Sequence, residues 1–116
     1  MTTAVPILPV ADVERALPWW GRLGFAEEFR HQFDTNSPRF VGIRRDDCLV
    51  YLSEHRGDAS APGLIYLWVD DVDAVAAEFG VTIDEMPWAR DCEVTDPDGN
   101  RVRAATASRA EPPYPD

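Results

Sequence analysis

The chain has 116 residues, of which 45% are hydrophobic and 10% aromatic, and its formal net charge is −10. This length fits one domain that can bury a core, and the hydrophobic content argues against disorder throughout the chain. The negative charge excludes the usual nucleic-acid binder, which needs a basic surface, and disfavours an anionic membrane; it favours cationic partners, or simply solubility.

The basic side chains are all arginines, which excludes chemistry that needs a lysine, such as a Schiff base or a P-loop. The two cysteines, Cys48 and Cys92, form no CxxC motif. Their spacing predicts neither a zinc site nor a redox pair, and a cytoplasmic protein is the simplest interpretation. We expect no signal peptide and no membrane span, because no apolar run approaches about 18 residues.

The first half predicts a strand, a helix and three further strands. Residues 5–10 form a short apolar run with two prolines, typical of an edge strand. Asp12 is placed to cap a helix that ends at Gly24 and contains Pro18, which should kink it. Three strands are expected after this helix, at residues 25–33, 39–44 and 48–53.

The second half repeats this order after a polar linker at residues 55–62. An apolar strand at residues 64–69 leads into a helix capped by Asp70 or Asp71 and closed by Gly80. Further strands are expected at residues 81–83, 89–95 and 101–106, with a turn of type I or II at 96–100.

Residues 5–12 and 64–71 match in character, because each is an apolar strand that ends in a capping Asp. This internal repeat predicts two halves, each too small for a stable core, that must pair. The expected domain spans residues 1–107, with module one at about 4–54, module two at about 63–107, and a flexible tail at 108–116.

Four motifs carry a family resemblance: WWGRLGF at 19–25, DDVDAV at 70–75, PW at 87–88 and DPDGN at 96–100. Together with the repeat, they resemble the vicinal oxygen chelate superfamily, which includes glyoxalase I, extradiol dioxygenases and bleomycin resistance proteins. The resemblance covers residues 4 to about 107. It implies an α+β fold of two βαβββ modules that form a curled mixed sheet with a concave groove, the glyoxalase/bleomycin resistance fold.

Enzymes of this superfamily hold a divalent metal in the groove. The resemblance places the four ligand positions at Val5, Tyr51, Leu64 and Arg103. None of these side chains is a usual ligand for a transition metal, and an arginine would repel a cation. His31 and His55 are expected at the surface. We therefore expect no metal, no cofactor, and no metal-dependent isomerase or dioxygenase activity.

The strands near these positions are rich in rings on one side, because side chains alternate between the two faces of a sheet. The predicted groove side holds Tyr66 and Trp68 on one strand, Tyr51 on another and Arg103 on a third. Such a surface suits a flat, partly apolar ligand held by stacking. The alternative is that these rings are core side chains that cover the second face of the sheet.

Within the superfamily, the chain most resembles the bleomycin-binding branch, on AVPIL at 4–8, FVGIRRDD at 40–47 and PWARD at 87–91. In that branch a Phe and a Trp sandwich a planar part of the antibiotic, and Phe40 and Trp88 match them here. The expected ligand-binding residues are Phe40, Tyr51, Tyr66, Trp68, Trp88 and Arg103, and no catalytic residue is expected. The candidate acidic partners of a cationic ligand are Asp46, Asp47, Asp91 and Glu93.

The branch forms two-fold dimers with an exchanged N-terminal strand, so the resemblance implies a homodimer, and Pro6 matches the proline near the crossover. One departure is the loop: only residues 81–86 separate Gly80 from Pro87, where the branch has a long loop over the antibiotic. The branch's PWGR is also PWAR here, with Ala89 in place of a flexible glycine. The short loop argues against tight binding of bleomycin itself.

Three functions stay open on the sequence alone. The first is a non-catalytic binding protein, similar to antibiotic resistance proteins, that sequesters a cationic, partly planar antibiotic or metabolite. The second is a metal-independent enzyme, with Arg103 holding an anion and Glu93 or Asp91 acting as a base. The third is a dimeric domain whose groove is filled by its own side chains. The first is the preferred prediction.

Overall fold

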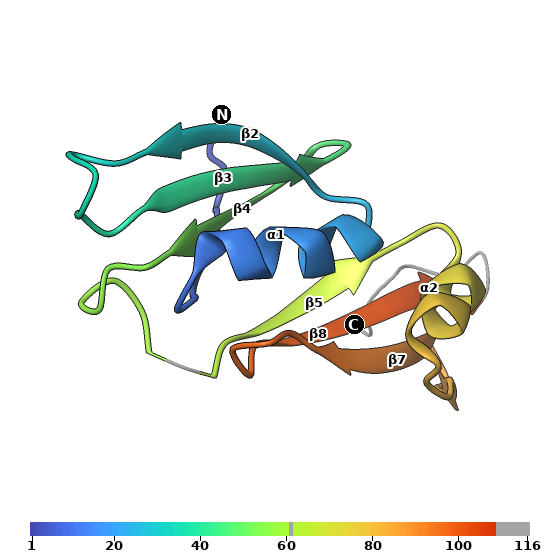
Figure 1. Cartoon of the computed structure of the whole chain (residues 1–116). Coiled ribbons are helices and arrows are strands. Elements are labelled where there is room, and N and C mark those ends of the chain that lie inside the picture. Colours follow the sequence, from blue (N-terminus) through green and yellow to red (C-terminus); the bar gives the residue numbers. More distant parts are fainter. Residues whose placement is uncertain (61, 109–116) are drawn as a thin grey trace. The chain divides into compact units, whose positions relative to one another are not determined.

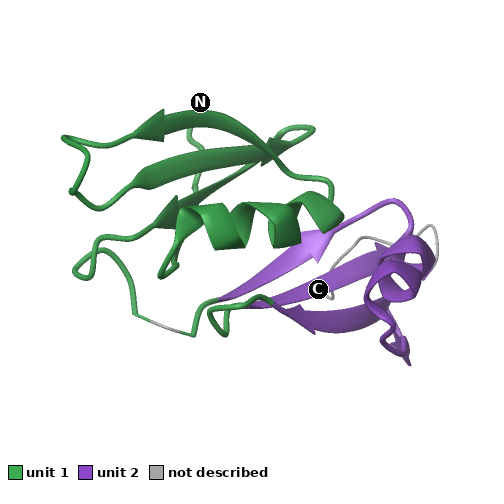
Figure 2. Ribbon diagram, in the orientation of Figure 1, with its two compact units in different colours: residues 1–63, 96–100 green, residues 64–95, 101–116 purple. Residues whose placement is uncertain are grey.

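The computed structural model describes residues 1–60 and 62–108. The chain divides into two compact units (Figure 2): unit 1 holds residues 1–63 and 96–100, and unit 2 holds the other described residues from 64 onward. Apart from Ser108, the expected tail lies outside the described residues. No helix in the described part of the chain is both long enough and apolar enough to cross a bilayer.

Unit 1 contains one helix and a four-stranded sheet (Figure 1). Its elements are β1 (Ile7–Pro9), α1 (Val13–Arg22), β2 (Ala26–His31), β3 (Phe40–Arg45) and β4 (Cys48–Ser53). The strand order is β1-β4-β3-β2, with β1 parallel to β4 and the other pairs antiparallel. The proline-containing β1 therefore lies at an edge of the sheet, as predicted. It pairs with β4 of its own chain, so strand exchange stays a prediction.

Unit 2 repeats this arrangement. Its elements are β5 (Leu64–Trp68), α2 (Val72–Phe79), β6 (Asp84–Glu85), β7 (Ala89–Thr95) and β8 (Arg101–Ala107). The order is β5-β8-β7-β6, and β5 runs parallel to β8. The prediction of an α+β fold built from two βαβββ modules is confirmed, and each module has its own mixed sheet.

The strand expected at residues 81–83 is wrong, because the short strand forms at β6, directly after it. The Val81 N–H continues the helix end by donating to the Ala76 carbonyl at 3.1 Å. The chain becomes extended only where Asp84 and Glu85 pair with the start of β7. Backbone pairing across a tight turn, rather than apolar character, therefore decides the position of this strand.

Both helices begin at the expected capping residues. The Asp12 carboxylate accepts a hydrogen bond from the backbone N–H two residues later at 2.9 Å. Asp71, and not Asp70, caps α2, accepting from the N–H three residues later at 3.1 Å. Gly80 ends α2 in the left-handed conformation at φ 67°, which a glycine adopts without steric cost.

In each unit, side chains alternate along the strands between a buried apolar face of the sheet and a more open face. In unit 1, Val41, Ile43, Val50 and Leu52 are fully buried, as is Trp20 of α1. In unit 2, helix α2 packs on β7 and β8. The buried side chains of these strands are Cys92, Val94, Val102 and Ala104. The alternate residues of the same strands project from the opposite, more open face of each sheet.

The turn between β7 and β8 belongs to unit 1. The Asp96 carbonyl accepts from the Gly99 N–H at 3.1 Å, and the Asp96 carboxylate accepts from the N–H groups of Asp98 and Asn100 at 2.9 and 2.8 Å. Among described residues other than glycine, only Asp46 has a positive φ. A type II turn needs a positive φ at its third residue, here Asp98, so of the two expected forms the turn is type I.

Buried hydrogen bonds anchor this turn within unit 1. Asn100 is 0% exposed; its Nδ2 donates to the Pro9 carbonyl at 2.8 Å, and its Oδ1 accepts from the Gly63 N–H at 2.9 Å. The Trp20 indole N–H donates to the Asp96 carboxylate at 3.3 Å. The DPDGN motif, which carries much of the family resemblance, therefore has a structural role in this chain.

Glu54 lies directly after β4 and collects hydrogen bonds from two segments of unit 1. Its carboxylate accepts from the backbone N–H groups of Val13 and Arg39, both at 2.8 Å, and from the Arg39 guanidinium at 3.0 Å. Burial by itself raises the pKa of Glu54, but these hydrogen bonds together outweigh burial and hold the pKa below its usual value.

The substitution Glu54→Gln is expected to lower the free energy of unfolding at pH 7 by about 1–2 kcal/mol, because it removes the charge from these hydrogen bonds. A folded-state pKa below the unfolded value stabilises the fold above the usual carboxyl pKa, and this contribution is lost as the pH falls through the folded value. Urea unfolding at neutral and acidic pH measures both effects. The exposed Asp47→Asn is the control; equal midpoints for Glu54→Gln and the native chain at pH 7 would contradict the prediction.

Candidate functional site

The open face of the unit 2 sheet carries large apolar side chains from β5. Leu64, Tyr66 and Trp68 are 51%, 42% and 38% exposed, whereas Leu67 between the last two is 7% exposed. The ring centroids of Tyr66 and Trp68 lie 5.1 Å apart with the planes tilted by 54°. Together with Trp88, Arg101, Arg103 and Glu93, described next, we call this surface the aromatic face.

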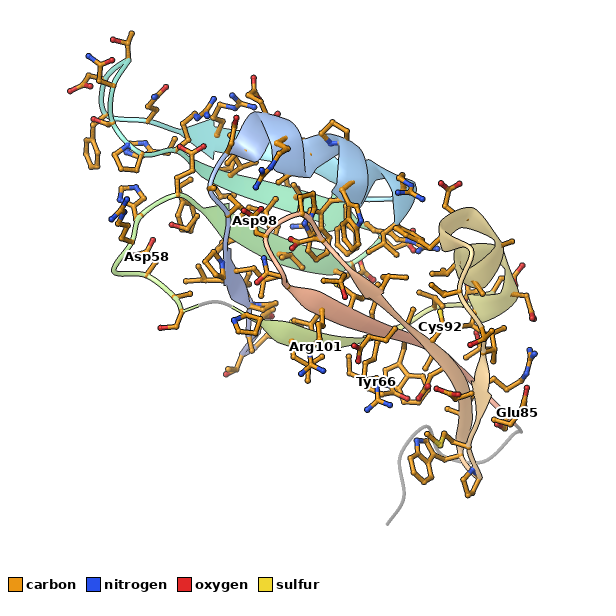
Figure 3. All side chains as sticks on the ribbon, turned by 60° about the horizontal axis from the view of Figure 1, so that its bottom comes forward. Asp58, Tyr66, Glu85, Cys92, Asp98 and Arg101 are labelled. Carbon is orange, nitrogen blue, oxygen red and sulfur yellow. The ribbon has the colours of Figure 1, made fainter. Side chains whose placement is uncertain are left out.

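The register of the sheet brings charged side chains beside these rings. Tyr66 pairs with Arg103, and Arg103 pairs with Glu93 on its other side. Leu64 pairs with Arg101 in the next row. Residues paired across neighbouring strands project from the same side of a sheet, and so do alternate residues of one strand. Tyr66 and Arg101, which lie in adjacent rows, accordingly lie on the same side in Figure 3. The aromatic face thus combines rings with two guanidinium groups.

The two arginines of this face form no hydrogen bond with the neighbouring carboxylate of Glu93. Glu93 lies between them, 3.6 Å from Arg101 Nη1 and 3.9 Å from Arg103 Nε, and both distances exceed hydrogen-bond length. The Nε of Arg103 is buried and has no hydrogen-bond partner. Both guanidinium groups therefore have unused hydrogen-bonding capacity.

Trp88 completes the aromatic face on the β7 side, and the buried Asp91 lies beside it. Trp88 is 37% exposed, while Asp91 is 2% exposed and lies 3.5 Å from the Tyr66 hydroxyl. Burial and the Asp91 charge raise the pKa of Tyr66, opposed by a hydrogen bond with Trp88 and by the Arg103 charge. The tyrosine hydroxyl is therefore kept neutral. Four of the predicted site residues share this unit: Tyr66, Trp68, Trp88 and Arg103.

The other two predicted residues, Phe40 and Tyr51, lie in unit 1 with ring centroids 5.0 Å apart. Phe29 of β2 packs against both, with centroid distances of 6.5 and 5.6 Å. Its ring lies over Gly42 and leaves no room for a Cβ there. Sequence reasoning missed Phe29, although a glycine inside a strand often marks such a close approach. A clamp of Phe40 and Trp88 would join residues of different units and stays a prediction.

The positions that the resemblance assigns to metal ligands do not fit a divalent cation. Val5 and Leu64 are aliphatic, and Arg103 keeps its positive charge. Tyr51 alone offers an oxygen, and its ring packs against Phe29 and Phe40. Within residues 1–60 and 62–108, no three His, Cys, Asp or Glu side chains gather as a metal would require. These side chains support no metal-dependent step.

A hollow of about 430 Å³ lies in unit 1. His55 and Arg56 of the predicted linker line it together with Glu54 and Asp98. Its other lining residues are Pro9, Val10, Ala11, Ser53 and Ala59. Because no Phe, Tyr or Trp side chain lines this hollow, it does not suit a planar ligand held between large rings.

The family model described as glyoxalase superfamily protein matches residues 1–111. The match covers nearly the whole chain, so the protein belongs to the glyoxalase superfamily, and the resemblance to the vicinal oxygen chelate superfamily is confirmed. A sequence search of curated proteins found no match.

Solved structures with the same fold include antibiotic-binding proteins and an enzyme. TnmS3, an antibiotic-binding protein from Streptomyces sp. CB03234, is 23% identical with a TM-score of 0.73, covering 93% of this chain and 98% of that one. A bleomycin-binding protein in complex with bleomycin is 21% identical, with a TM-score of 0.64 and coverage of 91% and 98%. Lactoylglutathione lyase from Agrobacterium tumefaciens is 18% identical, with a TM-score of 0.65 and coverage of 91% and 94%. At these identities the likeness establishes the fold alone.

Proposed function

We propose that the protein is a non-catalytic binding protein that sequesters a partly planar antibiotic or metabolite. The observation that carries this proposal is the aromatic face, where Tyr66 and Trp68 of β5 are 42% and 38% exposed and Trp88, 37% exposed, lies within hydrogen-bond reach of Tyr66. Large rings that stay exposed on a folded domain mark binding surfaces, and stacking against flat ligands makes use of their area. The antibiotic-binding proteins TnmS3 and bleomycin-binding protein have the same fold, which is compatible with such a role.

We propose further that the protein is a homodimer in the cytoplasm, as the resemblance and the cysteine content suggest.

A second candidate function, a dimeric domain whose groove is filled by its own side chains, is favoured by one observation in unit 1. There Phe29 packs on Phe40 and Tyr51 and occupies the space above Gly42. The two candidates differ in whether a planar compound binds at all.

Calorimetric titration with a neutral planar compound, naphthalene-2-carboxamide, and with bleomycin tests the proposal. The substitutions Trp68→Ala and Trp88→Ala are each expected to weaken binding of the planar compound about tenfold, because loss of one stacked ring removes about 0.5–1.5 kcal/mol beyond the lost contact area. The same measurement on Phe40→Ala tests the predicted clamp.

The matched control is Phe33→Ala, which removes a 77% exposed ring of unit 1 outside the aromatic face. It should bind both compounds as the native chain does. Undiminished binding in Trp68→Ala and in Trp88→Ala would show that the aromatic face is not the site. No binding of either compound by the native chain would instead favour the self-filled domain.

A further inference from the structure

The net charge of the chain and the accessible charge of the aromatic face predict ligands of opposite charge. The net charge of −10 suggests a cationic ligand. The accessible charged groups next to the rings, however, include two guanidinium groups and one carboxylate: the side chains of Arg101, Arg103 and Glu93 are 44%, 39% and 39% exposed. Distant carboxylates act weakly at the face, because charges are screened over about 8 Å at physiological ionic strength.

Other arginines of the described chain are committed to carboxylates by short hydrogen bonds. Arg44 donates to Glu28 at 2.7 Å, and Arg90 donates to Asp73 at 2.8 Å and to Glu85 at 2.9 Å. These groups satisfy one another and leave little attraction for a ligand.

Arg101 and Arg103 differ from these pairs. They share the single carboxylate of Glu93 at 3.6 and 3.9 Å, and Arg103 Nε is buried without an acceptor. Asp91 adds a second negative charge, but it is 2% exposed and lies beside the Tyr66 hydroxyl. Glu93 is also exposed and without a hydrogen-bonded partner, but this single accessible carboxylate faces two guanidinium groups, so the accessible charge of the face is positive.

We infer that the ligand of the aromatic face is a planar aromatic acid, whose ring stacks on Tyr66 and Trp68 and whose anionic group is bound by Arg103 with Arg101 beside it. This inference rests on the proposed binding function and names its ligand class. The sheet register places Arg103 directly beside Tyr66. A guanidinium is planar and presents paired N–H groups that match the two oxygens of a carboxylate, so a ring and its acid group can be held together at one row of the sheet.

The test compares three compounds with the same ring: naphthalene-2-carboxylate, its neutral carboxamide, and the cationic naphthalen-2-ylmethylammonium. Calorimetry on the full chain at physiological salt is expected to show the carboxylate binding about tenfold more tightly than the carboxamide, since hydrogen bonds between charged partners are roughly twice as strong as neutral ones. The ammonium compound should bind most weakly. Added salt should weaken binding of the carboxylate and leave that of the carboxamide nearly constant.

The substitution Arg103→Gln should bring the ratio of carboxylate to carboxamide affinity close to one. Arg44→Gln, on the unit 1 sheet, is the matched control and should keep the native ratio. Thermal unfolding checks that each variant folds. If Arg103→Gln does not fold, Arg101→Gln and the salt dependence of the native chain carry the test. Either the substitution or the added salt should then lower the ratio of carboxylate to carboxamide affinity.

Three results would overturn the inference. If the carboxamide or the ammonium compound binds as tightly as the carboxylate, the ligand class is wrong while the proposed binding function stands. If Arg103→Gln keeps the native ratio, the anionic group is bound elsewhere. If none of the compounds binds and sedimentation shows that Trp68→Ala turns a dimer into a monomer, the face is a subunit interface, and the proposed function fails as well.

Discussion

Replacing Trp20 by Ala is expected to lower the free energy of unfolding by about 3–5 kcal/mol, as is usual for removing a large buried aromatic side chain. Trp20 is 0% exposed and lies in the last turn of α1. Its ring makes edge contacts with Trp19 and Phe25 at centroid distances of 5.1 and 5.5 Å. Its indole N–H also donates to Asp96, so the substitution leaves a cavity and removes one hydrogen bond from the Asp96 carboxylate.

Urea unfolding followed by circular dichroism measures this loss without relying on the deleted fluorophore. The substitution Trp20→Phe retains a ring and loses the N–H, and we expect it to cost less than Trp20→Ala. Trp88→Ala, at a 37% exposed position, is the control for removing a tryptophan from the surface. Equal losses for Trp20→Ala and Trp88→Ala would contradict the buried position of Trp20.

The substitution Asn100→Ala is expected to cost about 2–4 kcal/mol. Asn100 is fully buried, and its amide serves the Gly63 N–H, the Pro9 carbonyl and the Asp96 carboxylate. Removing it leaves buried backbone groups without partners, and each such group costs about 1–3 kcal/mol. A loss below about 0.5 kcal/mol, the range of ordinary surface changes, would show that the turn is not anchored in this way.

The substitution Asn100→Asp separates the charge effect from the shape effect. It retains an acceptor for Gly63 but places a second carboxylate 3.0 Å from Asp96, at the position of the Asn100 Nδ2. Burial and a neighbouring like charge both raise the pKa of the new carboxyl. A folded pKa above the unfolded value makes the variant lose stability as the pH rises. We therefore expect Asn100→Asp to be less stable than Asn100→Ala at neutral pH and to recover relative to it in acid.

Much of the local structure follows from short sequence patterns. The strand expected at residues 89–95 is β7 (Ala89–Thr95), and Asp12 caps its helix as expected. Capping and alternation depend on neighbours within a few residues, which a sequence displays directly. The position of β6 was predicted wrongly from such patterns. Backbone pairing with β7 determines where β6 forms, and its own residues show no apolar alternation.

The candidate site was predicted in part for the same reason. Alternation along β5 places Tyr66 and Trp68 on the open face, and β8 places Arg103 beside them. Phe29 was not predicted as a site residue, because its role depends on contacts with Gly42 and Tyr51. Both residues lie on other strands, distant from Phe29 in the sequence. The missing hydrogen-bond partners of Arg101 and Arg103 were equally out of reach, since they depend on where Glu93 lies in three dimensions.

By itself, the sequence determined the repeat, the two βαβββ modules, the helix caps and the aromatic character of one strand face, because these properties depend on residues close together in the chain. Only the tertiary structure decided that the DPDGN turn is anchored in unit 1, where Asn100 meets Pro9 and Asp96 meets Trp20. The tertiary structure likewise changed the meaning of the net charge of −10. Charge composition is a sum over the whole chain, whereas a ligand responds to the few charges within a screening length of its site, and on the aromatic face these include two arginines without hydrogen-bonded partners.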